Sequence, residues 1–305
     1  MTKPIIVTGG AGFIGSHVAD VLVEAGHDVF VLDHAKPHKD RVNARVTYYK
    51  VDVRSKDVEK IFSKIQPGGI FHFAGHLFDR ESILKPMLSV HNNIEGLVNI
   101  MEAFRRHGSG KICFASSAAV YGKQEEIPIN ESAVISPATP YGISKYSGEQ
   151  YLRFYEAQYH IPYVALRMAN VYGPRQNSSA QSGIMAIFID RLLRGEEVFM
   201  NNDGKTTRDY VYVQDVVSAF MKAFESDVTG IFNIGTSVET STQEVFETLC
   251  EDMQLKVKPK MRPEIEDFIK HNSLDACRAK ATFGWEPKVM LKEGIHETIA
   301  WYRAH

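Results

Sequence analysis

The sequence has few cysteines, little net charge and no long hydrophobic segment, and each shortage excludes a class of protein. Its three cysteines, Cys113, Cys250 and Cys277, stand too far apart for a disulfide framework or for a paired-cysteine metal site. Sparse cysteine is typical of a reducing compartment, so we expect a cytoplasmic protein with no bound metal.

The charge balance excludes a broad surface for nucleic acid or lipid. The chain has 35 Lys and Arg against 37 Asp and Glu, a formal net charge of -2. This balance supplies no wide positive field for nucleic acid or an anionic membrane. No apolar run is long enough for a signal peptide or a membrane span. With 44% hydrophobic residues, the composition is that of a globular protein with one large domain or two unequal ones.

Short apolar segments rich in β-branched residues alternate with segments of helical hydrophobic period. The predicted strands are residues 4–8, 28–33, 46–51, 69–74, 111–116 and 162–167. The predicted helices between and after them are residues 14–25, 58–65, 93–106 and 144–159. Strands buried on both faces and joined by helices predict an α/β fold with a doubly wound parallel Rossmann sheet.

The regular alternation ends near Asn170, where a polar loop follows. We therefore predict a Rossmann domain over residues 1–170 and a smaller α+β lobe over residues 171–305. Residues 209 to about 235 are expected to return to the first domain.

A glycine-rich turn follows the first predicted strand and opens the first helix. It reads TGGAGFIGS from Thr8 to Ser16, with Gly9, Gly12 and Gly15 at a dinucleotide-binding spacing and Phe13 and Ile14 at the start of the helix. Glycines let the backbone approach a pyrophosphate, which then meets the positive end of the helix. The pattern alone also describes an ordinary tight turn, and its place between strand and helix favours a nucleotide site.

Two acidic residues are candidates for holding the adenosine half of the cofactor. Asp33 ends the second strand at the spacing where a carboxylate accepts hydrogen bonds from ribose, which favours NAD over NADP despite the nearby Lys36 and Lys39. Asp52 follows the third strand, and two interpretations stay open for it: contact with the adenine amine, or a cap on the helix that starts near Lys56.

Tyr141 and Lys145 stand four residues apart at the start of a predicted helix and so share one helix face. A free tyrosine has a pKa of about 10 and is a poor base at neutral pH, but a nearby ammonium stabilises its phenolate. Ser117, at the end of the fifth strand, supplies a hydroxyl where α/β sheets bind ligands.

Seven motifs, in the same order, resemble the extended short-chain dehydrogenase/reductase family, and among its members the UDP-hexose 4-epimerases. They are TGGAGFIGS, HFAG, SSAAVYG, PYGISK, LRMANVYGPRQ, DGKTTRDYVYVQDV and FGWEPKV. The resemblance implies bound NAD and reversible inversion at C4 of a UDP-hexose through a transient 4-keto sugar and NADH. In that reaction Tyr141 takes the proton of the 4-hydroxyl, Ser117 hydrogen-bonds the same oxygen, and Lys145 holds ribose and tunes Tyr141.

The resemblance also implies further binding residues. Those expected around NAD are Val53, Phe73, Ala74, Gly75 and Asn93. Those expected around the UDP-sugar are Asn170, Arg208 and Arg262, with Lys270 as an alternative cation for the diphosphate. The small Asn272 stands where a pocket residue separates simple hexoses from N-acetyl sugars, so we expect the pocket to admit UDP-GlcNAc or UDP-GalNAc as well as UDP-glucose and UDP-galactose. A homodimer paired through residues 93–106 and 144–159 is expected.

Three alternatives stay open from the sequence. A dehydratase or decarboxylase needs an acid just after the catalytic serine, where this chain has Ala118 and Ala119. A UDP-glucuronate 4-epimerase needs a cation for the C6 carboxylate, and Arg175 is the local candidate. A non-catalytic NAD-binding sensor would keep the fold and lose the chemistry.

Overall fold

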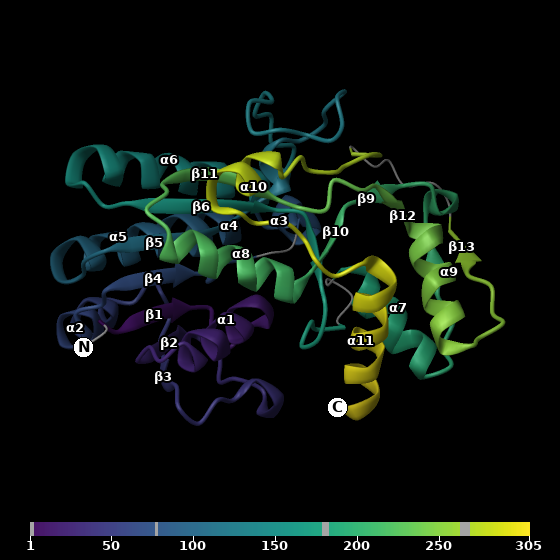
Figure 1. The fold of residues 1–305 in the computed structure, drawn as a ribbon, viewed down its shortest axis with the longest axis horizontal. Helices are drawn as coiled ribbons and strands as arrows, with labels where there is room; N and C mark the ends of the chain where they lie inside the picture. Colours follow the sequence, from purple (N-terminus) through teal and green to yellow (C-terminus); the bar gives the residue numbers. More distant parts are fainter. Residues whose placement is uncertain (1–2, 77–78, 179–182, 263–268) are drawn as a thin grey trace.

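The computed structural model describes residues 3–76, 79–178, 183–262 and 269–305. A larger domain built on a central sheet lies beside a smaller lobe that contains α7, α9 and α11 (Figure 1). Within the described residues, no helix combines the length and apolar character that crossing a membrane requires.

The central sheet has seven parallel strands in the order β3-β2-β1-β4-β5-β6-β11. They are β1 (Ile5–Thr8), β2 (Val29–Asp33), β3 (Thr47–Lys50), β4 (Gly69–His72), β5 (Lys111–Ser117), β6 (Tyr163–Met168) and β11 (Gly230–Ile234). The order reverses between β1 and β4, as in a Rossmann sheet. The predicted fold class is confirmed, and the six strands predicted before residue 170 are all present.

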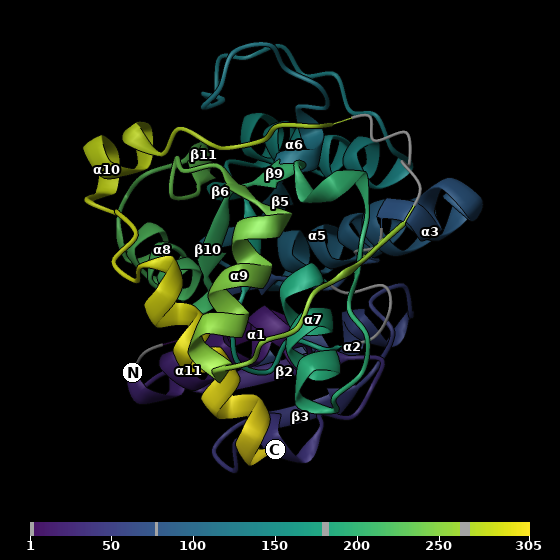
Figure 2. The same ribbon diagram turned by 90° about the vertical axis from the view of Figure 1, so that its right-hand side faces the viewer.

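Helices cover both faces of the sheet. On one face lie α1 (Phe13–Glu24) and α8 (Val213–Glu225), and on the other α2 (Asp57–Ile65), α5 (Gly96–His107) and α6 (Pro140–Tyr159). Figure 2 shows α8 and α5 on opposite sides of the strands. Neighbouring strand residues enter different cores, since Ile6 packs with the α2 and α5 layer and Val7 with the α1 and α8 layer.

The smaller lobe combines helices with short strands. Its strands are β7 (Asn170–Tyr172), β8 (Phe199–Met200), β9 (Thr207–Arg208), β10 (Tyr210–Tyr212), β12 (Thr240–Ser241) and β13 (Lys260–Met261). Its helices are α7 (Ile184–Leu193), α9 (Thr242–Met253) and α11 (Leu291–Ala304), while α10 (Cys277–Phe283) packs near β11 of the larger sheet. Ser241 caps α9 in a reciprocal capping box with Glu244, which fixes where that helix begins.

The region before α5 differs from the prediction. Two short helices, α3 (Asp79–Leu84) and α4 (Pro86–Ser89), lead into a π-helical turn at Val90–Glu95, and regular α-helix begins only at Gly96. The predicted helix over 93–106 therefore starts in a π-helical turn that places Asn93 in the interior. Such turns occur often at functional sites.

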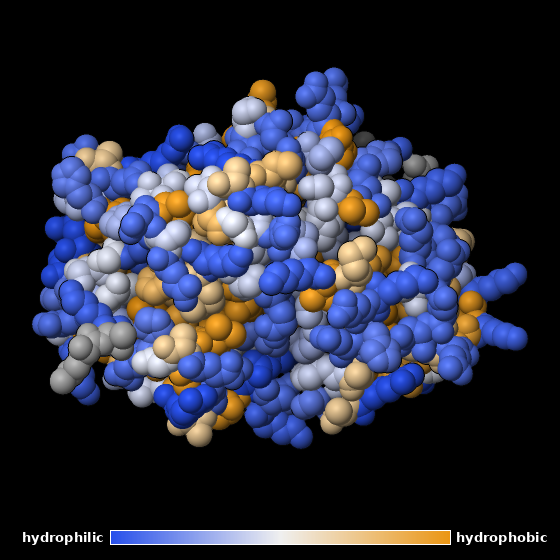
Figure 3. All heavy atoms as spheres, in the orientation of Figure 1, coloured by the Kyte–Doolittle hydropathy of each residue, from blue (hydrophilic) through white to orange (hydrophobic). Residues whose placement is uncertain are grey.

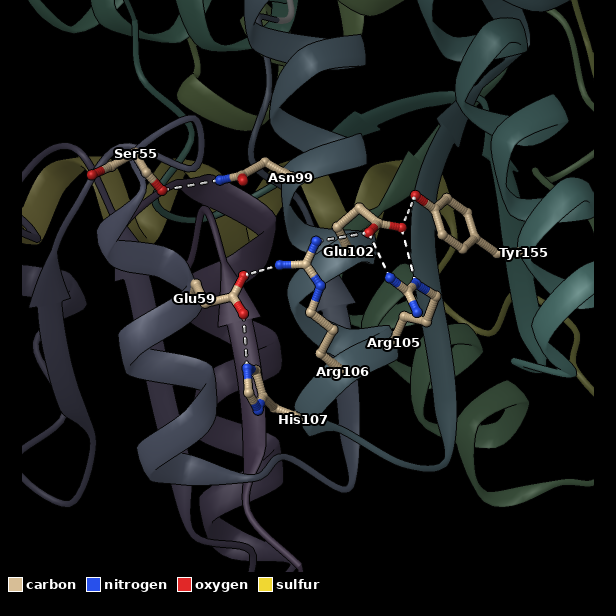
Figure 4. Close-up of polar contacts among 8 residues, drawn as sticks. All are labelled: Ser55, Glu59, Asn99, Glu102, Arg105, Arg106, His107 and Tyr155. Atoms are coloured by element: carbon tan, nitrogen blue, oxygen red, sulfur yellow. Dashed lines mark hydrogen bonds and ion pairs between the residues drawn. The ribbon is translucent and has the colours of Figure 1, made fainter.

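A polar network joins α2, α5 and α6 on the outer side of their layer (Figure 4). Glu102 on α5 accepts from Arg105 at 2.9 and 3.1 Å and from the hydroxyl of Tyr155 on α6 at 3.0 Å. Arg106 bridges Glu102 and Glu59 on α2. Each pair is partly exposed and stabilises little alone, but together they connect three helices.

Candidate active site

The glycine turn is packed so closely that it excludes side chains. Gly9 has a φ of 70°, and a Cβ on it would lie 2.6 Å from the Ala74 nitrogen. A Cβ on Gly15 would lie 2.5 Å from the Gly9 oxygen. Gly12 precedes α1 without a side-chain cap, which leaves the first helix amides for another acceptor. The turn therefore fits a dinucleotide pyrophosphate, and Phe13 and Ile14 lie half-buried at its helix side.

Asp33 places its carboxylate beside this turn. Its Oδ2 accepts from the Ala11 amide at 3.1 Å and its Oδ1 from the Ala35 amide at 3.0 Å. The carboxylate keeps unused lone pairs at the end of β2, where adenosine ribose binds in Rossmann domains. The geometry fits the predicted contact with ribose hydroxyls.

Asp52 does not cap α2, so that interpretation is wrong. Its carboxylate accepts instead from the Arg54 guanidinium at 2.6 and 2.9 Å, which lowers the pKa of Asp52 to about 2. Ser55 accepts from the Asp57 amide at the start of the helix. Contact of Asp52 with adenine stays a prediction.

The neighbouring Val53 is held in place from α5. Asn99 donates to the Val53 carbonyl oxygen at 2.6 Å, and a Cβ on Gly96 would meet Val53 at 2.7 Å. The loop after β3 is thus fixed against the helix layer at the edge where the cofactor candidates gather.

Tyr141 lies in the first turn of α6, which begins at Pro140, four residues before the predicted start of this helix. Thr139 accepts from the Gly142 amide at 3.1 Å, and Pro140 occupies the first helical position, where its missing N–H costs nothing. A side chain in the first turn lies at the positive end of the helix dipole, which favours an anion.

Lys145 is fully enclosed one turn later. Its Nζ donates to the Ala115 carbonyl oxygen at 2.7 Å and lies 5.8 Å from the centre of the Tyr141 ring. Burial lowers the pKa of Lys145 to about 8, and the charge of Glu149 partly opposes that shift. Lys145 is thus a cation at neutral pH, but it loses its proton at a lower pH than an exposed lysine does.

Ser117 ends β5 at the amino end of α6. Its Oγ accepts from the Ala119 amide at 3.2 Å, and a Cβ on Gly142 would lie 2.5 Å from the Ala119 oxygen. The glycine after Tyr141 therefore lets the helix approach the segment that follows Ser117. The adjacent Ser116 is buried and donates to Glu149 at 2.6 Å. Its hydroxyl therefore takes part in an interior hydrogen bond.

Gly75 and Asn93 connect the cofactor turn with the catalytic helix. Phe73 and Ala74 pack against Gly9, and a Cβ on Gly75 would lie 2.8 Å from Asn93 Oδ1 and 3.8 Å from Lys145 Nζ. Asn93 is buried and donates to Ser144 at 2.7 Å. The predicted cofactor residues and Lys145 thus converge at one end of the sheet.

Asp209, which the sequence reasoning did not select, joins several segments beside the predicted substrate residues Asn170 and Arg208. Its carboxylate is fully buried and accepts from the amides of Thr236 and Leu274, and burial raises its pKa. Its carbonyl oxygen accepts from the Asn170 amide at 2.8 Å. Arg208 precedes it in the chain.

Asn272 belongs to a segment beside these residues. The carbonyl oxygen of Lys270 accepts from the Thr207 amide, which sets that segment against β9. Asn272 is buried, and its Oδ1 has no hydrogen-bond partner within the described protein. A buried acceptor of this kind suits a ligand donor. Asn170, Arg208 and Asn272 therefore gather around Asp209.

Two other predicted cations have partners of their own. The Arg262 guanidinium stacks 4.0 Å above the Phe199 ring, and its amide pairs with Met200. Arg175 binds Asp20 on α1 at 2.7 Å. Neither contact joins the cluster around Asp209, and the choice between Arg262 and Lys270 for a diphosphate stays a prediction.

Arg41 is a further residue that the sequence reasoning passed over. Its guanidinium donates to the carbonyl oxygens of Ala11 in the glycine turn and of Arg175. It therefore ties the cofactor turn to the loop that leads into the smaller lobe. The signal available was only a cation eight residues after Asp33, in a stretch that also holds other basic residues.

Within the ranges that the structure covers, no three His, Cys, Asp or Glu side chains are grouped to hold a metal ion. The chemical groups at the site are instead a serine, a tyrosine, a lysine and a nucleotide turn. Such a set performs proton transfer beside a dinucleotide cofactor.

Comparison with known proteins identifies relatives along the whole chain. Residues 5–235 match the NAD dependent epimerase/dehydratase family. A UDP-glucose 4-epimerase from Thermotoga maritima, solved with UDP-glucose, has 39% identity and a TM-score of 0.95 over 99% of each chain. A UDP-N-acetylglucosamine 4-epimerase from Methanobrevibacter ruminantium, solved with UDP-N-acetylmuramic acid, has 30% identity and a TM-score of 0.94 over 99% of each chain. A UDP-glucose 4-epimerase from Thermus thermophilus, solved with NAD, has 36% identity and a TM-score of 0.92 over 99% of each chain.

Proposed function

The chain belongs to the NAD dependent epimerase/dehydratase family, and we propose that it is an NAD-dependent 4-epimerase of UDP-hexoses that interconverts UDP-glucose and UDP-galactose. The observation that carries this function is the junction of α6 and β5. It puts Tyr141 and the buried Lys145 beside the strand that ends in Ser117, next to a turn shaped for a dinucleotide.

The proton chemistry follows from these three side chains. Tyr141, as phenolate, takes the proton of the sugar 4-hydroxyl, and the Ser117 hydroxyl donates to the same oxygen as charge develops there. Lys145 stabilises the phenolate through its charge. Bound NAD supplies reversible two-electron oxidation at C4.

Inversion requires the oxidised sugar to turn over within the site. When C4 has become a carbonyl carbon, rotation of the hexose presents its other face, and Tyr141 returns the proton to the C4 oxygen during reduction. The diphosphate stays anchored meanwhile. We assign that role to Arg208, a cation suited to phosphate, with Asn170 beside it.

We expect the two parts of the fold to bind different ligands. Residues 1–170 carry the glycine turn, Asp33 and the catalytic residues and would bind NAD. Residues 171–305 carry Arg208 and Asn272 and would mainly bind the nucleotide sugar. Residues 209 to about 235 supply α8 and β11 to the larger domain.

Other chemistries on this fold lack support at the site. Elimination or decarboxylation would need an acid after Ser117, and Ala118 and Ala119 stand there. A uronic acid would need a cation near C6, and Arg175 is held by Asp20 on α1. A non-catalytic NAD-binding sensor would have no use for the buried Lys145 beside Tyr141.

Asn272 supports acceptance of N-acetyl sugars. Its side chain is smaller than tyrosine, and its unpartnered Oδ1 can accept from an acetamido N–H. If this is correct, UDP-GalNAc is converted alongside UDP-galactose, and Asn272→Tyr removes only the N-acetyl activity. Conversion of UDP-galactose with none of UDP-GalNAc by the unchanged protein would refute this substrate range.

A panel of UDP-sugars tests the function. The purified protein is incubated with UDP-glucose, UDP-galactose, their N-acetyl counterparts and UDP-glucuronate, with and without added NAD, and C4 inversion is followed by proton NMR. We expect inversion of the hexoses and none of the uronate. Inversion of UDP-glucuronate alone would favour the uronate epimerase.

A homodimer is supported by the outer face of α6. Ile143, Tyr151 and Phe154 are 50%, 39% and 49% exposed and lie on one side of that helix. The face seen in Figure 3, which carries α8, shows hydrophobic side chains only in separate patches among hydrophilic ones. We infer that α5 and α6 pair with those of a second copy. Sedimentation velocity tests this, since a monomer at all concentrations would exclude it.

A further inference from the structure

Glu149 is a buried charge that the reaction above does not use. It lies on α6 one turn after Lys145 and two turns after Tyr141, and none of its surface is exposed. Its carboxylate accepts from Arg167 on β6 at 2.6 and 2.9 Å and from Ser116 on β5 at 2.6 Å. A buried pair of this quality is costly to desolvate, and apolar residues would often serve stability equally well.

The same helix face contacts two consecutive residues of β5. Lys145 binds the carbonyl oxygen of Ala115 and Glu149 binds the hydroxyl of Ser116, while Ser117 comes next at the strand end. Tyr141 precedes Lys145 by one turn on that face. The two polar contacts therefore fix the height and rotation of α6 against the strand that supplies the serine.

We propose that Glu149 is a positioning residue of the epimerisation, which fastens the catalytic helix to the end of β5 and places a carboxylate one turn from Lys145. The proposal rests on the proposed function, since it assigns Glu149 a part in that reaction. Glu149 itself touches neither sugar nor cofactor in this scheme.

Arg167 orients the charge of Glu149. Its third contact goes to the Tyr121 hydroxyl at 2.9 Å, and Tyr121 in turn donates to Asn233 at 2.7 Å. These contacts hold the guanidinium in place against Glu149. Glu149 itself follows Lys145 by one turn on α6, so its carboxylate is the end of the pair on the helix that carries Lys145.

The other groups around Lys145 do not replace Glu149. His72 on β4 is fully buried, and burial lowers its pKa to about 3, so it is neutral in the working range. Phe114 on β5 and Tyr141 offer ring faces at 5.0 and 5.8 Å, and Asn93 offers an amide. Before Tyr141 ionises, Glu149 is the carboxylate that opposes the effect of burial on Lys145.

The test is a titration of Lys145 itself. Protein labelled with ¹³Cε-lysine is followed by NMR from about pH 6 to about pH 11, with the Lys145 signal assigned through Lys145→Arg. In the unchanged protein Lys145 is expected to titrate near pH 8. In Glu149→Gln it should titrate at lower pH, because the carboxylate is gone and Arg167 is left as an uncompensated cation.

A second variant guards against loss of folding. Glu149→Met with Arg167→Met replaces the whole pair by apolar side chains of similar size, which buried pairs often tolerate. Removing both ends of the dipole should move the Lys145 titration down by less than Glu149→Gln does. The titration midpoint of Lys145 should therefore be highest in the unchanged protein, lower in the double variant and lowest in Glu149→Gln.

Turnover provides the other readout. Glu149→Gln should lower kcat about 10- to 100-fold through displaced catalytic groups, with KM for the UDP-sugar nearly unchanged. Glu149→Asp, which keeps the charge, should restore the Lys145 midpoint in part.

The matched control is Glu102→Gln. Glu102 also accepts from an arginine and a hydroxyl, those of Arg105 and Tyr155, but on the outer side of the helix layer (Figure 4). The substitution Glu102→Gln should leave the Lys145 midpoint and kcat unchanged. An unchanged Lys145 midpoint in Glu149→Gln and in the double variant would overturn the proposal, even if the protein epimerises UDP-hexoses. No inversion by the unchanged protein would overturn the proposed function instead.

Discussion

Lys145 on α6 donates a hydrogen bond of 2.7 Å from Nζ to the carbonyl oxygen of Ala115 on β5. This contact joins the helix that carries Tyr141 to the strand that carries Ser117, two residues beyond Ala115. In the proposed reaction both groups act on one substrate oxygen, and this requires a junction between their elements.

Tyr141→Phe removes the proton acceptor and keeps the ring. We expect kcat to fall about 10²- to 10⁴-fold, the usual contribution of a general base. Bound NAD and the melting temperature should change little. Tyr146→Phe, on the same helix, is the control and should keep its turnover. Full activity of the Tyr141 variant would exclude it as the base.

Activity should fall in alkaline solution because Lys145 loses its proton. As the pH rises through about 8, the neutral amine no longer stabilises the phenolate of Tyr141, and kcat decreases. A kcat profile measured at saturating UDP-galactose checks this. A profile that stays level well above that pH would show that the charge of Lys145 is not needed.

Asp33→Ala should weaken NAD binding. Loss of the ribose acceptor is expected to raise the Kd about 10-fold or more, equivalent to about 1.4 kcal/mol. Calorimetric titration of apoprotein with NAD measures it. Asp40→Ala is the control, since Asp40 pairs with the exposed His38. Equal affinities in both variants would remove Asp33 from the cofactor site.

His72 should make the protein less stable in acid. Burial lowers its folded pKa from 6.5 to about 3, so between those values the unfolded chain binds the extra proton and stability falls as the pH falls. The slope from this group approaches about 1.4 kcal/mol per pH unit. Denaturant unfolding should show a smaller slope in His72→Asn than in the unchanged protein.

The exposed His160 provides the comparison for that measurement. It has a φ of 55°, a conformation that asparagine tolerates, so His160→Asn should keep the slope of the unchanged protein. If the stability of His72→Asn depended on pH in the same way as that of His160→Asn, burial of His72 would not be the cause of the loss of stability in acid.

The sequence predicted elements whose signal is local. Buried parallel strands are short apolar runs, and the turn from Gly9 to Gly15 and the Tyr141–Lys145 spacing each lie within one segment. Structure was needed where partners are distant in the chain. Glu149 and Arg167 are 18 residues apart, and Asp209 binds the Leu274 amide, so no local pattern marks either contact.

The predicted helix start at residue 93 was wrong for a different reason, since regular α-helix begins only at Gly96. The π-helical turn at Val90–Glu95 depends on how Asn93 is drawn toward His76 and Ser144, which lie in other segments. Hydrophobic period alone predicts a continuous helix there.

The fate of the hydrogen at C4 tests the central claim most directly. The protein is incubated with UDP-galactose carrying deuterium at C4, and the UDP-glucose formed is examined by NMR and mass spectrometry. Oxidation and reduction at C4 by the same bound NAD predict inversion with the deuterium kept at C4. Inversion with loss of the deuterium to water, or no inversion at all, would contradict the account.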